Sequence, residues 1–326
     1  MIRTILKLSV AVGLLTYLVS NGKLDFKLIL KALESPVLYL VGLFMILIQC
    51  SINAIRWKLI LSTQTSEKIP SLFIIMITWV GMFFNTILPG AVSGDLVKMV
   101  YLKKIDEKLT KTSMFLSVLM DRIYGLIALV LLTGIISIFR SSYLLSLSDE
   151  IKKILTLNLT FMAGIFLFIS TLFLSNKIQD YIIKAVSKLP KIGTQISHLF
   201  ECFWAIGKHK LIFFKSISIS MVGQLLNLTA FYIITIPLTQ GAVEIQDIYT
   251  FAPIGMILTA IPLAPGGMGV GHVAFDKLFQ YLQFQNGADM FNIYWITMIS
   301  INLVGVIPYL LLGKKKVVHT DQVEAA

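Results

Sequence analysis

Long uncharged apolar runs separated by short basic segments dominate the chain. A helix of about 20 apolar residues crosses a hydrocarbon core of about 30 Å. The pattern predicts six such spans, at residues 4–20, 36–55, 112–139, 154–174, 211–238 and 291–312. Two further apolar runs, 69–102 and 248–283, contain helix breakers and are expected to fold differently.

Each interrupted run carries a Pro–Gly turn near its middle. The first turn lies within residues 85–95 and the second within residues 262–272. Proline removes a backbone donor and glycine relaxes the φ constraint, so neither run is expected to form a continuous helix. Irregular backbone at membrane depth is tolerated only where protein covers it or where it lines a polar cavity. Two such breaks in corresponding halves of a chain point to a transport site.

The distribution of the basic residues favours one of two membrane topologies. The 326-residue chain has 28 Lys and Arg against 17 Asp and Glu. If both interrupted runs enter and leave on one side, 19 of the 28 basic residues fall on the cytoplasmic side. If the first run crossed fully, the lysines of 98–111 and 177–210 would move outside. We therefore expect two re-entrant hairpins, with both chain termini in the cytoplasm.

The expected fold is an all-α polytopic membrane protein forming one membrane domain over residues 1–326. Six full transmembrane helices and two re-entrant hairpins give eight hydrophobic segments. Their order repeats as span, span, hairpin, span, which predicts inverted repeats at approximately 1–140 and 150–313. As a helix, residues 69–88 would extend about 30 Å. The sequence therefore leaves open whether this arm of the hairpin crosses the whole membrane.

Residues 178–206 form a basic segment with apolar residues at helical spacing. Such a segment can lie on an anionic cytoplasmic leaflet, and a solvated loop helix is the alternative. The net charge of +11 is distributed over short loops, which indicates membrane topology and not nucleic-acid binding.

Ionisable residues inside spans are expensive and mark functional sites. Asp121 and Arg122 are neighbours on a helix and cannot face each other, so each needs another partner, and Asp95 is expected for Arg122. Ser93 suits an N-cap, and Asp95 and Lys98 follow it, which predicts an anion site at a helix start. Arg56 ends the second span, where snorkelling to the interface is the alternative to recruiting a headgroup.

Other polar residues complete the candidate set. Gln224, Asn227 and Asn302 could join helices or line a path, and a lone histidine such as His272 could be purely structural. The candidate substrate-binding residues are Arg56, Asn85, Pro89, Gly90, Ser93, Gly94, Asp95, Lys98, Asp121, Arg122, Gln224, Pro265, Gly266, Gly267, Gly269 and His272. We expect no catalytic residue, metal or cofactor, although an aspartate base at Asp95 or Asp121 stays open.

Four short pieces together resemble the flippase-like membrane-domain family typified by the transmembrane half of lysylphosphatidylglycerol synthase. The resemblance covers nearly the whole chain. The matching pieces are residues 53–57, residues 85–95, Asp121-Arg122 with Gly125-Leu126, and residues 262–269. Three positions depart from the usual family pattern: Ser93 replaces Gly, Lys98 replaces Arg and His272 replaces an acidic residue. The soluble aminoacyl-transferase half of such proteins is not expected here.

The resemblance implies a lipid flippase that moves an anionic phospholipid or a polyprenyl-phosphate-linked headgroup across the cytoplasmic membrane. Membrane lipids are the expected partners. A second copy of the chain or a synthase enzyme is a further candidate partner. A membrane-embedded transferase acting on a lipid phosphate and a non-catalytic scaffold are the alternatives.

Overall fold

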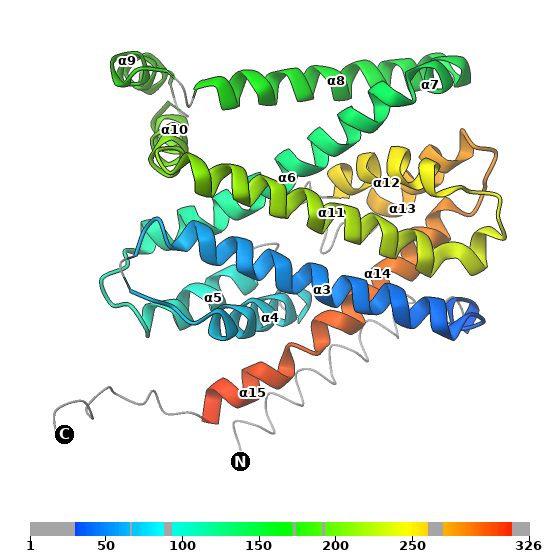
Figure 1. Cartoon of the computed structure of the whole chain (residues 1–326), viewed down its shortest axis with the longest axis horizontal. Coiled ribbons are helices and arrows are strands. Elements are labelled where there is room, and N and C mark those ends of the chain that lie inside the picture. Colours follow the sequence, from blue (N-terminus) through cyan, green and yellow to red (C-terminus); the bar gives the residue numbers. More distant parts are fainter. Residues whose placement is uncertain are drawn as a thin grey trace.

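The structure, a computed structural model, describes residues 30–314 apart from 66, 88–92, 172–173, 191–192 and 260–269. Every regular element in these ranges is a helix, and the helices are labelled α3 to α15 in Figure 1. The all-α class is confirmed. The longest helices run side by side along the long axis of the molecule, as membrane spans do (Figure 1).

Five stretches of the described residues are long and apolar enough to cross a membrane. They are α3 (Pro36–Leu61), α6 (Lys111–Phe139), α8 (Asp149–Ser170), α11 (Lys210–Thr239), and α14 (Gly287–Leu303) together with α15 (Val306–Lys314). Five of the six predicted spans are therefore helical, while the predicted span 4–20 lies outside the described residues. A short helix, α7 (Ser141–Leu147), joins α6 to α8.

The last predicted span is interrupted, which the apolar pattern did not reveal. α14 ends at Leu303 and α15 begins at Val306, with Pro308 in its first turn. Proline clashes with the carbonyl four residues earlier, so the helix cannot run through unchanged. A Cβ on Gly305 would lie only 2.1 Å from the backbone oxygen of Trp79, so the break lets this backbone pack closely against α4.

Each interrupted run forms two packed helices, as its breaker predicts. The first gives α4 (Ser71–Ile87) and α5 (Ser93–Lys103), and the second gives α12 (Ile245–Thr259) and α13 (Val270–Gln280). The longest, α4, has 17 residues and extends about 26 Å. The turns between the helices lie outside the described residues, and with them the candidates Pro89, Gly90, Pro265, Gly266, Gly267 and Gly269.

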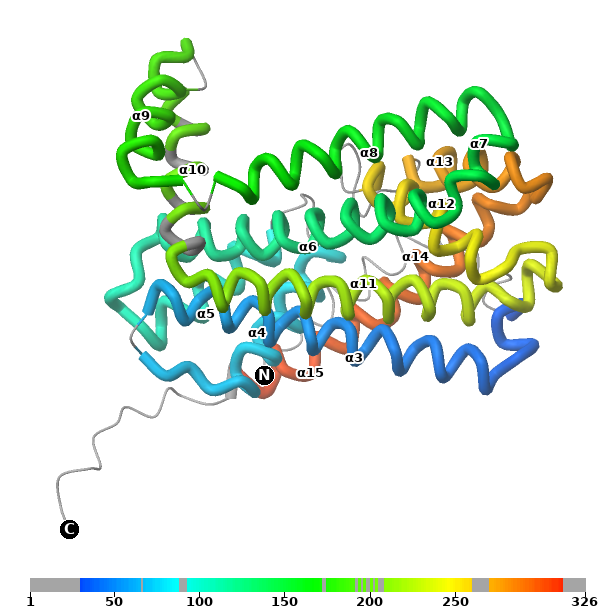
Figure 2. The backbone as a smooth tube through the Cα atoms, turned by 45° about the horizontal axis from the view of Figure 1, so that its top comes forward, coloured from blue at the N-terminus to red at the C-terminus, as the bar shows by residue number. Residues whose placement is uncertain are grey.

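The predicted amphipathic segment forms α9 (Asn176–Ser187) and α10 (Gly193–Gly207). These two helices project from one end of the molecule, and α9 runs across the direction of the long spans (Figures 1 and 2). Ile178 and Tyr181 of α9 are exposed, although Ile182 and Ile183 pack on the core. An apolar side of α9 is therefore left uncovered at this end.

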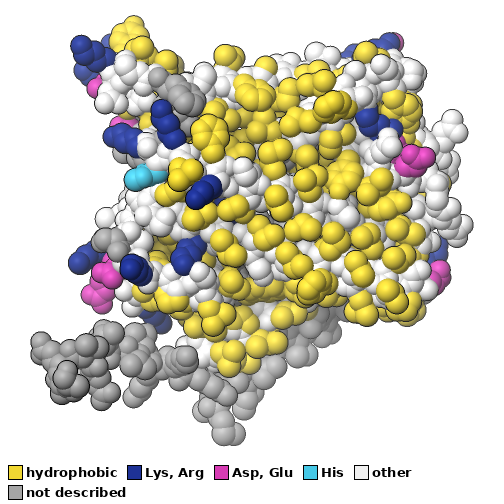
Figure 3. Space-filling model, viewed as in Figure 1, with side chains coloured by type: hydrophobic (Ala, Val, Ile, Leu, Met, Phe, Trp, Pro, Cys, Tyr) yellow, Lys and Arg dark blue, Asp and Glu magenta, His cyan; other side chains and the backbone are white. Residues whose placement is uncertain are grey.

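The surface separates into an apolar body and charged ends. Apolar side chains cover the middle of the face drawn in Figure 3, and basic side chains gather mainly at one end. That end is where α3 finishes and where α6 and α11 begin (Figure 1). The distribution is the one expected of a protein whose middle lies in hydrocarbon.

Candidate functional site

Arg56 of α3 is buried inside the bundle, with 5% of its surface exposed. Its Nε donates to Oδ1 of Asp121 on α6 at 2.7 Å, and its Nη1 donates to the Ser220 hydroxyl on α11 at 2.8 Å. The guanidinium thus joins three helices. The snorkelling interpretation of Arg56 is wrong, because the side chain turns into the protein and pairs with an acidic side chain there.

Asp95 lies at the centre of a second ionic group and is 3% exposed. Its Oδ1 is 2.9 Å from Nζ of Lys98, and its Oδ2 accepts from Nε of Arg122 at 3.0 Å and also from Nη2. The expected pairing of Arg122 with Asp95 is confirmed. Because adjacent helical side chains point about 100° apart, Asp121 meets α3 while Arg122 meets α5.

Arg122 occupies the outer face of α6. Its side chain is 47% exposed, and Phe115 and Leu126, seven residues before and four residues after it, are exposed as well. This spacing places all three on one face of the helix. Lys111 starts α6, so Arg122 lies about 17 Å along it, close to half the thickness of a hydrocarbon core. A cation therefore lies on an apolar, outward-facing surface, partway along a helix that is long and apolar enough to cross a membrane.

Close backbone packing fixes the start of α5 against the end of α4. A Cβ on Gly94 would lie 1.8 Å from the carbonyl oxygen of Gly81, so no larger residue fits there. The Gly94 N–H donates to Oδ1 of Asn85 at 2.7 Å, and the Ser93 hydroxyl donates to the carbonyl of Phe84 at 3.4 Å. The Asn85 side chain of α4 thus accepts the Gly94 amide at the start of α5.

A cavity of about 220 Å³ opens beside the two ionic groups. Of the predicted site residues, Arg56, Lys98 and Asp121 line it. Its wall is built from α3, α4, α5, α6 and α14, and its lining residues are Gln49, Cys50, Asn53, Arg56, Trp57, Thr78, Met82, Lys98, Asp121 and Met298. The Lys98 ammonium also lies 5.3 Å from the centre of the Trp57 ring, a cation–π contact that holds it over this wall.

Two other predicted residues have different surroundings. Gln224 of α11 donates from Nε2 to the carbonyl of Gly125 at 3.3 Å, and a Cβ on Gly125 would lie 3.4 Å from Nη1 of Arg56. Gln224 therefore supports the helix turn beside the Arg56 guanidinium. His272 lies edge-on to Phe291, with ring centres 5.0 Å apart, and is not among the cavity-lining residues.

Four polar residues near the site were missed from sequence. They are Gln49, Asn53, Thr78 and Ser220. A signal existed for two of them: Gln49, Asn53 and Arg56 recur at the i, i+4, i+7 spacing of one helical face inside an otherwise apolar span. Asn227 and Asn302 bond to Tyr294 and Thr86 respectively, which confirms them as residues that join helices.

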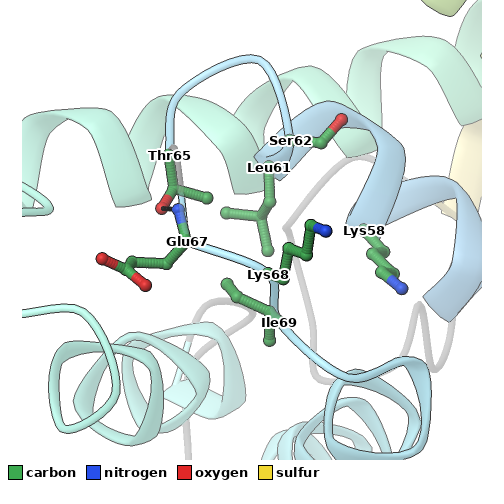
Figure 4. Close-up of a pocket in the computed structure, with 7 residues that line it drawn as sticks. All are labelled: Lys58, Leu61, Ser62, Thr65, Glu67, Lys68 and Ile69. Carbon is green, nitrogen blue, oxygen red and sulfur yellow. Dashed lines mark hydrogen bonds between the residues drawn. The ribbon is translucent and has the colours of Figure 1, made fainter.

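A wider hollow of about 340 Å³ lies at the basic end, around the connection from α3 to α4. Figure 4 shows the Lys58 and Lys68 ammonium groups on one side of it and the Glu67 carboxylate on the other. Lys58 also donates to the Ser71 hydroxyl at 2.7 Å. This hollow contains none of the residues of the ionic groups, so it is a surface feature separate from the candidate site.

The ionic cluster, defined as Arg56, Asp95, Lys98, Asp121 and Arg122, holds three cations and two carboxylates and so carries a formal charge of +1. Both carboxylates are committed to cations. The cluster is thus arranged to attract a single negative charge without leaving a carboxylate uncompensated. A phosphate diester carries one such charge.

Comparison with known proteins identifies the family. Searches of curated proteins and of solved structures found no match. A family profile described as the lysylphosphatidylglycerol synthase TM region matches residues 4–310, nearly the whole chain and every member of the ionic cluster. The chain therefore belongs to the family of the lysylphosphatidylglycerol synthase transmembrane region.

Proposed function

We propose that this protein is a lipid flippase that moves lipids with an anionic, phosphate-containing headgroup across the membrane. The observation that carries the proposal is the position of Arg122. Arg122 is paired with Asp95, and its side chain is still 47% exposed on an apolar outer face, about 17 Å into a span, where a second anion can also reach it. A lipid phosphate arriving from the bilayer is such an anion.

The ionic cluster gives the phosphate successive partners. Arg122 faces outward and Lys98 lines the internal cavity, while Asp95 contacts both. When a phosphate pairs with Arg122, Asp95 keeps its bond to Lys98, so its buried charge stays compensated. Arg56 also lines the cavity, with Asp121 as its partner. Acyl chains would stay in the lipid while the headgroup passes inward from Arg122.

The proposal includes a topology in which α4–α5 and α12–α13 are re-entrant hairpins of two inverted repeats. Support comes from α5 and α13, which have 11 residues each and extend about 16 Å, half of a hydrocarbon core, while α4 is the longer arm at about 26 Å. We assign the basic end to the cytoplasm by the positive-inside rule, with both termini on that side and the cytoplasmic membrane as the location.

Transport is tested in proteoliposomes by the accessibility of acyl-labelled lipids to an impermeant quencher. The wild type should move anionic phospholipids faster than protein-free vesicles, and Arg122→Gln and Asp95→Asn should abolish most of this gain. Arg140→Gln is the matched control, because Arg140 forms a similar pair with Asp247 at 2.9 Å outside the cluster. Equal rates for wild type and Arg122→Gln would refute the site.

A transferase acting on a lipid phosphate predicts a different pattern. Such enzymes commonly use a divalent metal to bridge phosphates. Flipping that is unchanged by a chelator, with no new lipid product, supports transport. A metal-dependent new product that requires Asp95 or Asp121 would replace the flippase proposal.

A further inference from the structure

The chain between α8 and α11 must lie at a membrane surface. Both helices are long and apolar enough to cross a membrane, and α8 ends at Ser170 while α11 begins at Lys210. The helices between them, α9 and α10, therefore lie outside the hydrocarbon core, at the basic end of the molecule (Figures 1 and 3). Since α9 runs across the direction of the long spans, it lies along the plane of the membrane (Figure 2).

Contacts with its neighbours hold α9 in this position. Gln179 of α9 donates from Nε2 to the carbonyl of Leu174 at 3.3 Å, and Trp204 of α10 donates from Nε1 to the hydroxyl of Thr171 at 3.1 Å. Thr171 is the C-cap residue of α8. Ile182 of α9 packs against a buried cluster that includes Trp204. One side of α9 is thus covered by protein, and the helix is not free to rotate about its axis.

The neighbouring side of α9 is apolar and exposed. Ile178 is 46% exposed, Tyr181 is 73% exposed, and Ala185 is exposed as well. Their i, i+3, i+7 spacing places them on one face of the helix. We call Ile178, Tyr181 and Ala185 the α9 strip. A tyrosine suits the boundary of a membrane, because its ring is apolar and its hydroxyl can reach water.

Two lysines of α9 flank the strip. Lys177 and Lys184 are exposed, and their i, i+7 spacing places them on one face. At about 100° per residue, both lie about 40–60° from Tyr181, on the side of the strip away from Ile182. Asp180, the one acidic residue of α9, lies about 100° from Tyr181, farther from the strip than either lysine. The order around the helix is therefore protein-covered side, apolar strip and basic side.

This order fits an anionic lipid leaflet. Helices that lie in a membrane surface bury their apolar face about 5–10 Å into the boundary between headgroups and acyl chains. Lysines beside that face extend their ammonium groups to the headgroups. Each lysine near an anionic surface favours binding about 5-fold.

A protein partner fits the strip less well. A stable protein–protein interface uses about 20–30 residues on each side, whereas the whole of α9 has 12 residues. A leaflet requires no such area, because the two neighbouring spans already hold α9 beside it. The surface and its charges therefore favour lipid as the occupant.

We infer that α9 is a surface anchor that binds an anionic lipid leaflet, with the α9 strip in the acyl-chain boundary and with Lys177 and Lys184 on lipid phosphates. Because α9 is bonded to the connection from α8, binding to the leaflet fixes how deeply this end of the protein lies in the membrane. The anchor uses none of the residues of the ionic cluster, so it does not depend on lipid transport.

The test places a nitroxide spin label on α9 of the whole chain in nanodiscs, in a background lacking Cys50 and Cys202. The label is attached at Ala185→Cys within the strip. The matched control is Ser187→Cys, an exposed position about 160° around the helix. Oxygen concentrates in hydrocarbon and a nickel chelate stays in water, so their effects on the label report its depth. In nanodiscs of phosphatidylcholine with phosphatidylglycerol, oxygen should dominate at position 185 and the chelate at position 187.

The role of the charges is tested with Lys177→Gln/Lys184→Gln. With the label at position 185, this variant should lower the ratio of lipid-inserted to water-exposed label about 25-fold, or about 5-fold for each lysine. Nanodiscs of phosphatidylcholine alone should lower the ratio in the same direction with both lysines present. Lys152→Gln/Lys153→Gln changes two exposed lysines at the opposite end of α8 and should leave the ratio unchanged.

Three results would overturn the anchor. The first is a label at position 185 that the chelate reaches more readily than oxygen in anionic nanodiscs. The second is shielding of position 185 from both reagents, because a second copy or another protein then covers the strip. The third is an equal ratio with and without phosphatidylglycerol, a comparison that needs no lysine substitution and so does not depend on the folding of a charge variant. Flipping can persist in all three cases, so failure of the anchor is distinguishable from failure of the proposed function.

Discussion

Replacing Asp95 by Asn tests whether the ionic cluster is held together as the structure indicates. Asp95 is 3% exposed and accepts from two cations. Asn preserves the shape of the side chain and removes its charge. Lys98, whose side chain is 13% exposed, would then remain inside the bundle without its carboxylate. Arg122, whose side chain is 47% exposed, would lose the same carboxylate.

The expected loss of stability follows from these exposures. Breaking a buried ion pair by removing one partner costs about 3–5 kcal/mol. Since Lys98 is the partner that stays buried inside the protein, we expect at least about 3 kcal/mol, which lowers the melting temperature by several degrees. Thermal unfolding in nanodiscs, followed by intrinsic fluorescence, measures this shift.

Two further variants test whether the loss of stability comes from the ion pair. In Asp95→Asn/Lys98→Met, the stranded cation is also removed, so about 2 kcal/mol of the loss should return. Asp149→Asn removes a carboxylate of an exposed pair with Lys152 and should leave the melting temperature unchanged. If Asp95→Asn has the same melting temperature as the wild type and the Asp149→Asn control, the cluster does not stabilise the protein and the reasoning fails.

Three further predictions follow from other parts of the molecule. Gly94→Ala should destabilise α4–α5 packing and abolish flipping, because its Cβ would lie 1.8 Å from the Gly81 carbonyl. The control Gly164→Ala places its Cβ in open space, so its melting temperature should be no lower than that of the wild type. In a background lacking Cys50 and Cys202, Lys104→Cys should react with an impermeant maleimide only in inside-out vesicles and Lys152→Cys only in right-side-out ones; labelling from the same side would contradict the topology. The Thr65 hydroxyl holds the pKa of Asp106, in the loop before α6, below its ordinary value. The stabilisation of the folded protein that comes from this lowered pKa is present above about pH 4, and it is lost as the pH falls through the pKa of Asp106 in the folded state. Thr65→Val should therefore make the melting temperature less sensitive to acid.

Much of the fold was predictable because the membrane fixes the length of an apolar run. Helices α3, α6, α8 and α11 lie close to the predicted spans for this reason. The pairing of Arg122 with Asp95 was also predictable, since adjacent helical residues must find different partners. The break between α14 and α15 was missed, although Pro308 three residues after Gly305 carried a signal for it.

The partner of Arg56 could not be read from the sequence. Its pairing with Asp121 depends on α3 lying beside α6, and its bond to Ser220 depends on α11 lying against both. Those neighbours follow from packing, which the apolar pattern of each span does not specify.

The most direct test of the lipid pathway is a density map of the protein in nanodiscs that contain an anionic phospholipid. The account predicts a phosphate within salt-bridge distance of the Arg122 guanidinium, at the outer face of α6 and well inside the two layers of annular headgroups. A map in which phosphates occur only at the two membrane surfaces, with acyl chains packed over Arg122, would contradict it.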